Sequence, residues 1–328
     1  MNACRRFAFC LLLAAISNRG AAAERDESAT FAVQPGCTLQ LDSYRGAVFV
    51  TESDAPEVRV SVHMEIGADT ATEAERLRAA LQLQMKAANN VVSIFARNPR
   101  ESRIRWIWHE DQQIDLVYRV AVPRRCNVDV KVLNGGVTIG NLAGDMKARV
   151  ENGTIFFRQI DGSVNAQVDN GDVVVSRCSG AFTARVLRGA IRAGTIGGPV
   201  DVRNRSGDIE LMMAQNSVRA LAEAGDVAIG FPRMFEGENT RVATSGGNIL
   251  AKIDPAANCR IEASSIWGRV ECKLPVAIEP GENGRRKLTA NLNAGGPLVT
   301  LHASGGNVRI ERGATPFVPV APATERAD

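Results

Sequence analysis

Between residues 130 and 237, apolar side chains recur at a fixed spacing of 18 residues. Four columns keep this spacing: Val132, Val150, Val168 and Val186; Val137, Ile155, Val173, Ile191, Ile209 and Val227; Leu142, Ile160, Cys178 and Ile196; and Ala148, Ala166 and Ala184. Around them apolar and polar positions alternate, which is typical of strands with one buried face. Because columns of different residue type share one period, the segment is an internal repeat of short strands.

Glycines mark the corners of each repeat. One series comprises Gly135, Gly153, Gly171, Gly189, Gly207 and Gly225, and a second, nine residues out of phase, comprises Gly144, Gly162, Gly180 and Gly198. Asn134, Asn152 and Asn170 precede the first three. Glycine and asparagine tolerate the positive φ that a sharp turn needs. Each repeat therefore predicts two short strands, and stacked repeats at about 4.8 Å would turn every column into an interior ladder.

A parallel β-solenoid with 18-residue coils explains this pattern best. Two other folds are possible. Asn-Gly turns also join antiparallel hairpins, as in a barrel or sandwich, but hairpins need not hold every column to one spacing. A left-handed helix of hexapeptides has three six-residue units per coil, but the apolar positions of residues 146–160 follow no six-residue pattern.

The front of the chain, residues 24–125, differs from the repeat and predicts an N-terminal cap of strands and one helix, together with the first coils. Strands are expected at residues 38–41, 47–51, 58–66, 91–96 and 114–122. Thr70 and Glu73 form a capping box, and Ala74, Leu77, Leu81, Met85 and Ala88 form one helical stripe behind it. Such a cap would protect the first coil from edge-to-edge association.

The remaining segments complete the expected organisation. Residues 1–23 read as a secretory signal peptide, with Arg5 and Arg6 before a short apolar run and Ala21-Ala22-Ala23 as the cleavage site. That run is too short to span a bilayer, and no later segment is long and apolar enough to do so. Residues 126–237 are the regular solenoid, residues 238–312 irregular coils, and residues 313–328 a proline-rich tail.

Charge and composition narrow the function classes. The 39 basic and 36 acidic residues become equal in number once the three arginines of the signal peptide are removed. A balanced surface argues against a nucleic-acid-binding protein. Hydrophobic residues make up 45% of the chain, which supports a sizeable core and excludes wholesale disorder. We expect an exported protein in the periplasm, the cell envelope or the extracellular space.

Export also decides how the cysteines are interpreted. Cys37, Cys126, Cys178, Cys259 and Cys272 remain in the mature chain, and no C-x-x-C pair indicates a zinc or thioredoxin-type site. Cys37 and Cys126 each lie nine residues before a corner glycine. If their strands stack directly, the two form a disulfide in an oxidising compartment. Cys178 lies in an interior column and is expected to remain a buried thiol.

The segment 122–144 and the units that follow it have a recognisable form. Val-Leu-Asn-Gly-Gly-Val-Thr-Ile, Asn-Gly-Thr-Ile and Asn-Gly-Asp-Val are short glycine-rich strand repeats, and segments 41–50 and 57–62 look like opening strands of the same kind. The chain resembles the bacterial putative-adhesin family, domains of unknown function, over most of residues 31–312. The resemblance implies a mainly β, right-handed parallel β-helix of the cell envelope. It implies no catalytic residues.

Enzymes also occur among right-handed β-helices, and their catalytic sites need carboxylates clustered on one outer face. Asp172, Asp208 and Asp226 share one column, but Ala190 interrupts it and aspartate is common in turns. The three histidines, His63, His109 and His302, are scattered. We therefore expect no catalytic site, no metal and no cofactor. A carbohydrate-active enzyme, a polysaccharide lyase or hydrolase, is the alternative.

Trp106 and Trp108 are the candidate ligand residues. In an extended strand they share one face, from which paired rings could stack on sugars or on lipid head groups. The alternative is that they pack the cap onto the solenoid, since tryptophans are mostly buried. The expected function is adhesin-like binding of envelope glycans or proteins through the coil faces. A self-assembling envelope scaffold is a further alternative.

Overall fold

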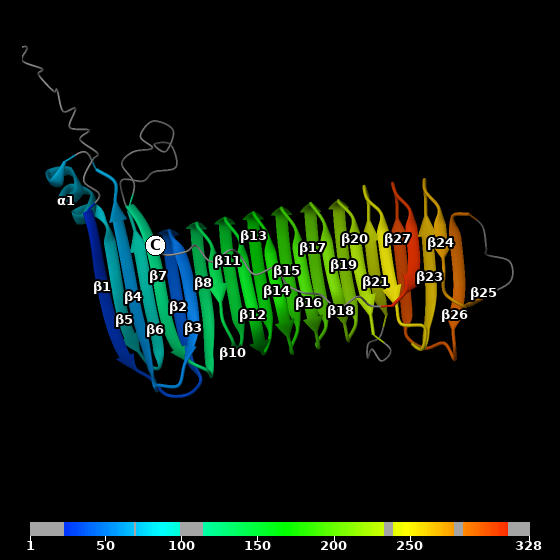
Figure 1. Ribbon diagram of the computed structural model, residues 1–328, viewed down its shortest axis with the longest axis horizontal. Coiled ribbons are helices and arrows are strands. Elements are labelled where there is room, and N and C mark those ends of the chain that lie inside the picture. Colours follow the sequence, from blue (N-terminus) through cyan, green and yellow to red (C-terminus); the bar gives the residue numbers. More distant parts are fainter. Residues whose placement is uncertain (1–22, 69, 99–113, 233–238, 279–284, 314–328) are drawn as a thin grey trace, which may run out of the picture.

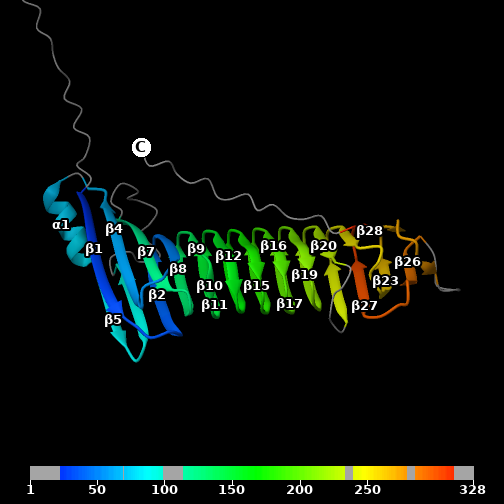
Figure 2. The ribbon, with the colours of Figure 1, turned by 60° about the horizontal axis from the view of Figure 1, so that its bottom comes forward.

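The computed structural model describes residues 23–68, 70–98, 114–232, 239–278 and 285–313. These residues form a long rod of two 14-stranded sheets lying face to face, with the single helix of the described chain, α1 (Ala71–Ala80), at the N-terminal end (Figure 1). Figure 2 shows the same succession of strands from a second side. The protein is therefore mainly β, as predicted.

The first sheet contains, in spatial order, β1 (Ala23–Ala32), β4 (Glu57–Ile66), β7 (Ile114–Pro123), β3 (Ala47–Ser53), β9 (Val137–Ile139), β12 (Ile155–Asp161), β14 (Val173–Cys178), β16 (Ile191–Ile196), β18 (Ile209–Ala214), β20 (Val227–Phe231), β22 (Ile249–Ile253), β28 (Val308–Arg312) and β24 (Val270–Cys272), with β10 (Leu142–Ala143) paired to β12. The second sheet contains β25 (Ala277–Ile278), β26 (Lys287–Leu292), β23 (Cys259–Ser265), β27 (Leu298–Ala303), β21 (Thr240–Thr244), β19 (Val218–Ala224), β17 (Val200–Ser206), β15 (Phe182–Arg188), β13 (Val164–Asn170), β11 (Met146–Asn152), β8 (Cys126–Asn134), β2 (Cys37–Arg45), β6 (Val91–Arg97) and β5 (Gln82–Ala88).

In the middle of the rod the chain alternates between the two sheets, one strand in each per coil. Val150 pairs in parallel with Val132 on one side and Val168 on the other, which is the predicted register of 18 residues. All four apolar columns point between the sheets and are buried. The antiparallel hairpins weighed as an alternative are absent from these coils, where every described pairing is parallel.

Both glycine series allow the corners of neighbouring coils to stack closely, although their backbone φ angles differ. Gly135, Gly153, Gly171, Gly189, Gly207 and Gly225 have φ between 124° and 144°. A side chain on any of them would also overlap the carbonyl oxygen of the preceding coil, for example Gly153 beneath Gly171. Gly162 and Gly180 lack the positive φ, but a Cβ there would likewise collide with the backbone of the coil below. Close stacking of the corners, more than φ alone, requires glycine.

Beyond Val186 the valine column alternates between buried polar residues and alanines: Asn204, Ala222, Thr244, Ala303 and Ser265. Asn204 pairs with Val186 and its Nδ2 donates to the carbonyl of Gly189 at 2.8 Å. Thr244 and Ser265 occupy comparable buried positions and donate to the carbonyls of Gly225 (2.9 Å) and Gly306 (2.7 Å). These side chains therefore satisfy carbonyl groups at the corners of neighbouring coils, which allows polar residues in the core.

The front region contains the predicted strands as β2, β3, β4, β6 and β7. Thr70 caps α1 as predicted, its side chain accepting from the Glu73 N–H at 3.2 Å. The predicted helical stripe is wrong beyond Leu81, because α1 ends at Ala80 and Met85 and Ala88 belong to strand β5. In β5 the half-buried residues alternate, so Leu83 and Met85 lie on one face against the core.

Both sheets end at the N-terminal side with an antiparallel strand. β1 pairs with β4 and β5 pairs with β6, whereas β2 and β3 pair in parallel with the first regular coil through β8 and β9. Half-buried Phe31, Leu77 and Leu83 pack against the core at this end. The described N-terminal strands and α1 therefore cover apolar side chains at this end of the rod, and their role as a separate cap stays a prediction.

The order of the C-terminal coils differs from the order of the sequence. β27 and β28, the last strands of the described chain, lie between the coil of β21 and β22 and the coil of β23 and β24 (Figure 1). Residues 259–272 therefore stack outside residues 298–312, and antiparallel β26 lies beyond β23. No helix of the described residues is long and apolar enough to cross a membrane.

Candidate functional site

The outer face of the second sheet carries a row of basic side chains. Because side chains alternate along a strand and the strands are in register, one outward position of each coil lines up with that of the next. The row consists of Lys131, Arg149, Gln167, Arg185 and Arg203. We call it the basic row. At the usual strand spacing of about 4.8 Å, its Cα atoms span roughly 19 Å.

The basic row is open to solvent and holds no carboxylate. Its four cations are exposed, and Gln167 is half-buried. Among the described residues, no ion pair involves Lys131, Arg149 or Arg185, whereas Arg203 lies 3.5 Å from Asp201. This row was not predicted from the sequence, although its members recur every 18 residues, the same spacing as the apolar columns.

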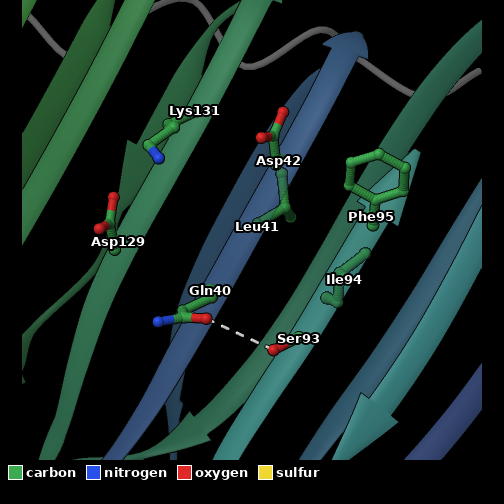
Figure 3. A pocket seen from close by; sticks show the side chains of 8 residues that line it. All are labelled: Gln40, Leu41, Asp42, Ser93, Ile94, Phe95, Asp129 and Lys131. Carbon is green, nitrogen blue, oxygen red and sulfur yellow. Dashed lines mark hydrogen bonds between the residues drawn. The ribbon is translucent and has the colours of Figure 1, made fainter. Parts of the chain in front are cut away.

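A shallow hollow of about 230 Å³ opens at the N-terminal end of this row (Figure 3). Side chains of β6, β2 and β8 line it: Ser93, Ile94, Phe95, Gln40, Leu41, Asp42, Asp129 and Lys131. Ser93 lies 3.5 Å from the Gln40 side-chain oxygen, while the Arg97 guanidinium lies 4.9 Å from the Phe95 ring centre. The hollow thus adjoins the basic row at Lys131 and adds hydrogen-bonding groups, one partly exposed ring and two carboxylates, Asp42 and Asp129.

The aspartate column considered for catalysis is engaged in the corners. Asp172 accepts from the Ala190 N–H at 2.7 Å and pairs with Arg192 at 2.7 Å. Asp208 accepts from the Asp226 N–H at 2.9 Å, and Asp226 accepts from the Asn248 N–H at 2.8 Å. Each carboxylate therefore caps a backbone donor of the next coil, which is the turn role expected of aspartate.

One serine–histidine pair was not foreseen from sequence spacing. Ser264 Oγ lies 2.9 Å from His302 Nδ1 on the outer face of the second sheet, and Ser304 Oγ lies 3.5 Å from Nε2. Neighbouring strands β23 and β27 bring them together across 38 residues. The ring nitrogen that faces a carboxylate in a serine hydrolase, Nδ1, faces the Ser264 hydroxyl here, so the pair lacks the acidic member of a catalytic triad.

Cys37 and Cys126 come together as the stacking hypothesis requires. They pair directly in β2 and β8, both are fully buried, and their Sγ atoms lie 3.0 Å apart as two thiols. The contact with Cys37, and then burial, raise the pKa of the Cys126 thiol above its usual range. The disulfide itself stays a prediction.

Cys178 is a buried thiol, as predicted. It is 1% exposed and donates to the Gly162 carbonyl at 3.2 Å. Burial raises its pKa to about 11. Cys259 is also buried, and burial raises its pKa to about 11.

Of the three tryptophans, only Trp267 lies in the part of the chain that the structure describes. Trp106 and Trp108 lie outside the described residues, so their role as a ligand face stays a prediction. Trp267, in the turn between β23 and β24, is 77% exposed. It was not predicted as a site. Among the described residues, no group of three or more histidine, cysteine, aspartate or glutamate side chains is placed to hold a metal ion.

Comparison with known proteins finds similarity among solved structures only. No family profile matches the sequence, and no curated protein matches it. The chain is similar to a putative adhesin from Bacteroides fragilis NCTC 9343, with 12% identity over 88% of this chain and 97% of the other and a TM-score of 0.43. It is similar to a putative adhesin from Parabacteroides merdae ATCC 43184, with 8% identity over 88% and 96% and a TM-score of 0.45. It is also similar to a protein from Parabacteroides distasonis ATCC 8503 described as a putative lipid binding protein, with 11% identity over 88% and 96% and a TM-score of 0.40.

Proposed function

We propose that this protein is an exported binding module without enzymatic activity, built as a right-handed parallel β-helix. It contacts an envelope glycan or protein through the outer face of its second sheet. The observation that carries this proposal is the open basic row beside the hollow of Figure 3, a regularly spaced set of side chains in which Lys131, Arg149 and Arg185 have no ion pair with another described residue. Export rests on the signal-peptide pattern of residues 1–23.

The engagement of the aspartate column supports a role without catalysis. Asp172, Asp208 and Asp226 have an oxygen committed to a backbone donor of the adjacent coil. A carboxylate that serves as general acid or nucleophile must instead meet the substrate. The flat, repetitive face fits a ligand held by many weak contacts better than one enclosed in a deep pocket.

The test compares the two faces of the rod with a matched pair of labels. Gln167→Cys places a thiol on the second sheet, and Gln159→Cys places one on the exposed face of the first. Both are made in a Cys272→Ser background, because Cys272 is the one half-buried cysteine among the described residues. Each variant is coupled to a polyethylene glycol maleimide and mixed with isolated envelopes of the source cell.

We expect the label at residue 167 to abolish co-sedimentation with envelopes and the label at residue 159 to leave it intact. Equal binding by both labelled proteins would contradict the assignment to the second sheet. Absence of binding by the unlabelled chain would contradict the binding function itself. Sedimentation of the purified chain alone as a large polymer would favour the scaffold alternative.

A further inference from the structure

We propose that the basic row binds a linear acidic polysaccharide, with its chain axis along the rod. This inference rests on the proposed function and names the class of ligand for the same face. The row offers one donor side chain per coil over five coils, from Lys131 to Arg203, with no acceptor-only side chain among them. A polymer with a carboxylate on successive sugars presents the complementary arrangement, a single file of anions.

The carboxylates near the row leave Arg149 and Arg185 without an anionic partner among the described residues. Asp42 lies directly opposite Lys131 in the neighbouring strand, so an acidic side chain bounds the row at its N-terminal end. Asp129 is 3.6 Å from Lys147, and Asp201 is 3.5 Å from Arg203, so each already has a cationic partner outside the three free members of the row. Glu151 lies two residues after Arg149, next to the corner at Gly153. Asp169 lies two residues after Gln167, next to the corner at Gly171. Arg219 and Arg241 continue the exposed positive charge onto the next two coils in the adjoining row.

The opposite face of the same coils has a different character. Its corresponding outward row contains Thr138, Phe156 and Val174, and the next member, Arg192, is paired with Asp172. The first sheet also carries the free cations Arg158 and Arg177, but Arg177 pairs with Gln159 and Thr195, so no file of cations runs from coil to coil there. A continuous file of positive charge steers an anionic ligand to the face that holds it.

The geometry favours a polymer over a membrane. The unpaired cations lie in single file along the coils. Exposed Leu133 and Leu187 lie on the same face in the adjoining row, where Glu151 and Asp169 separate them, so they form no continuous apolar anchor. A peripheral membrane surface combines basic residues with such apolar anchors. The hollow at the N-terminal end adds the Gln40 and Ser93 side chains, the partly exposed Phe95 ring and the carboxylates of Asp42 and Asp129, which suit the hydroxyl groups and the apolar face of a neutral sugar unit.

The test uses polygalacturonate, a linear uronate polymer, as the probe and neutral dextran as its control. The purified full chain is compared with Arg149→Gln/Arg185→Gln and with Arg158→Gln/Arg177→Gln. The second variant removes two exposed cations from the first sheet, and neither has an ion pair with another described residue. Melting temperatures of all three proteins verify that the fold is retained.

We expect the chain to bind polygalacturonate and not dextran, with affinity that falls as salt rises. Arg149→Gln/Arg185→Gln should weaken binding about tenfold, while Arg158→Gln/Arg177→Gln should leave it unchanged. An equal loss of affinity for polygalacturonate in both double variants would mean that only the net charge of the protein matters, and would overturn the assignment of the binding site to the basic row. Equally tight, row-dependent binding to phosphatidylglycerol vesicles would overturn the choice of a polysaccharide.

Failure of this inference is distinguishable from failure of the proposed function. If the chain binds envelopes but not polygalacturonate, the acidic polysaccharide is wrong and the binding face stands. If the label at residue 167 does not block envelope binding, the face is wrong whatever the polymer does. Retention of envelope binding by Arg149→Gln/Arg185→Gln would likewise overturn the role of the row.

Discussion

Cys37 lies directly opposite Cys126 in the neighbouring parallel strand, with the two Sγ atoms 3.0 Å apart, although 89 residues separate them in the chain. Approach by about 1 Å would form a disulfide of normal length. Oxidation by added oxidised glutathione, which is reduced in exchange, should therefore link the two residues. Peptide mapping without reduction should show one Cys37–Cys126 peptide and no linkage of Cys178.

The disulfide should also stabilise the fold. It would close a long loop, so the oxidised protein should exceed the reduced one by roughly 2–4 kcal/mol in free energy of unfolding. Cys37→Ala should abolish this difference and Cys178→Ala should not. If Cys37 and Cys126 still had free thiols after prolonged treatment with oxidised glutathione, the predicted disulfide would be contradicted.

Val168 and its neighbour Gln167 test the register of the ladder. Val168 is fully buried between Val150 and Val186, so Val168→Asp would place an unpaired carboxylate in the core and cost about 3–5 kcal/mol. Gln167→Asp points outward and should cost less than about 0.5 kcal/mol. Chemical denaturation measures both. Equal costs would mean that the assigned inward and outward faces are wrong.

The regular coils were predictable because one physical requirement acts at every repeat. Each coil must present the same inward residues as its neighbours and pass through the same crowded corners, so Val168 and Gly171 recur with a common period. The pairing of Cys37 with Cys126 followed from the same arithmetic. Even the basic row is visible as a column once the register is known.

Other parts of the fold could not be read from local pattern. Leu81 and Met85 are spaced as on a helix, but Leu83 and Met85 are also spaced as on a strand, and the open edge of β6 decides in favour of β5. The insertion of β27 and β28 between earlier coils depends on which strand edge remains available after folding. Ser264 meets His302 only because of that insertion.

Corner glycines should be far less replaceable than glycines with free space. Gly171 has φ 134°, and an added Cβ would overlap the carbonyl of Gly153. Gly171→Ala should therefore cost at least about 3 kcal/mol, from strain and overpacking together. Gly136 lacks a positive φ, and a Cβ there would be 3.6 Å from the Thr154 carbonyl, an ordinary contact. Gly136→Ala should be close to neutral in thermal melting, and similar losses in both variants would contradict the stacking argument.

The buried thiol of Cys178 should make the fold sensitive to alkali. Burial raises its pKa from 9.0 to about 11, so between these values the unfolded chain loses this proton while the folded chain keeps it. The free energy of unfolding should therefore be constant below pH 9 and decrease toward pH 11, by about 2 kcal/mol for this group. Cys178→Ala should show a shallower decrease than the parent protein over the same range. Identical slopes would show that the thiol does not titrate as buried.

Trp267 should dominate the accessible tryptophan fluorescence. It is 77% exposed in the turn after β23, so iodide should quench it efficiently and Trp267→Phe should remove the quenchable, red-shifted component. The remaining emission then reports Trp106 and Trp108 without interference. Strong quenching of that remainder, together with loss of envelope binding but unchanged melting in Trp106→Ala/Trp108→Ala, would support a ligand platform. Protection from iodide, with destabilisation of about 3–5 kcal/mol per ring, would instead identify them as packing residues.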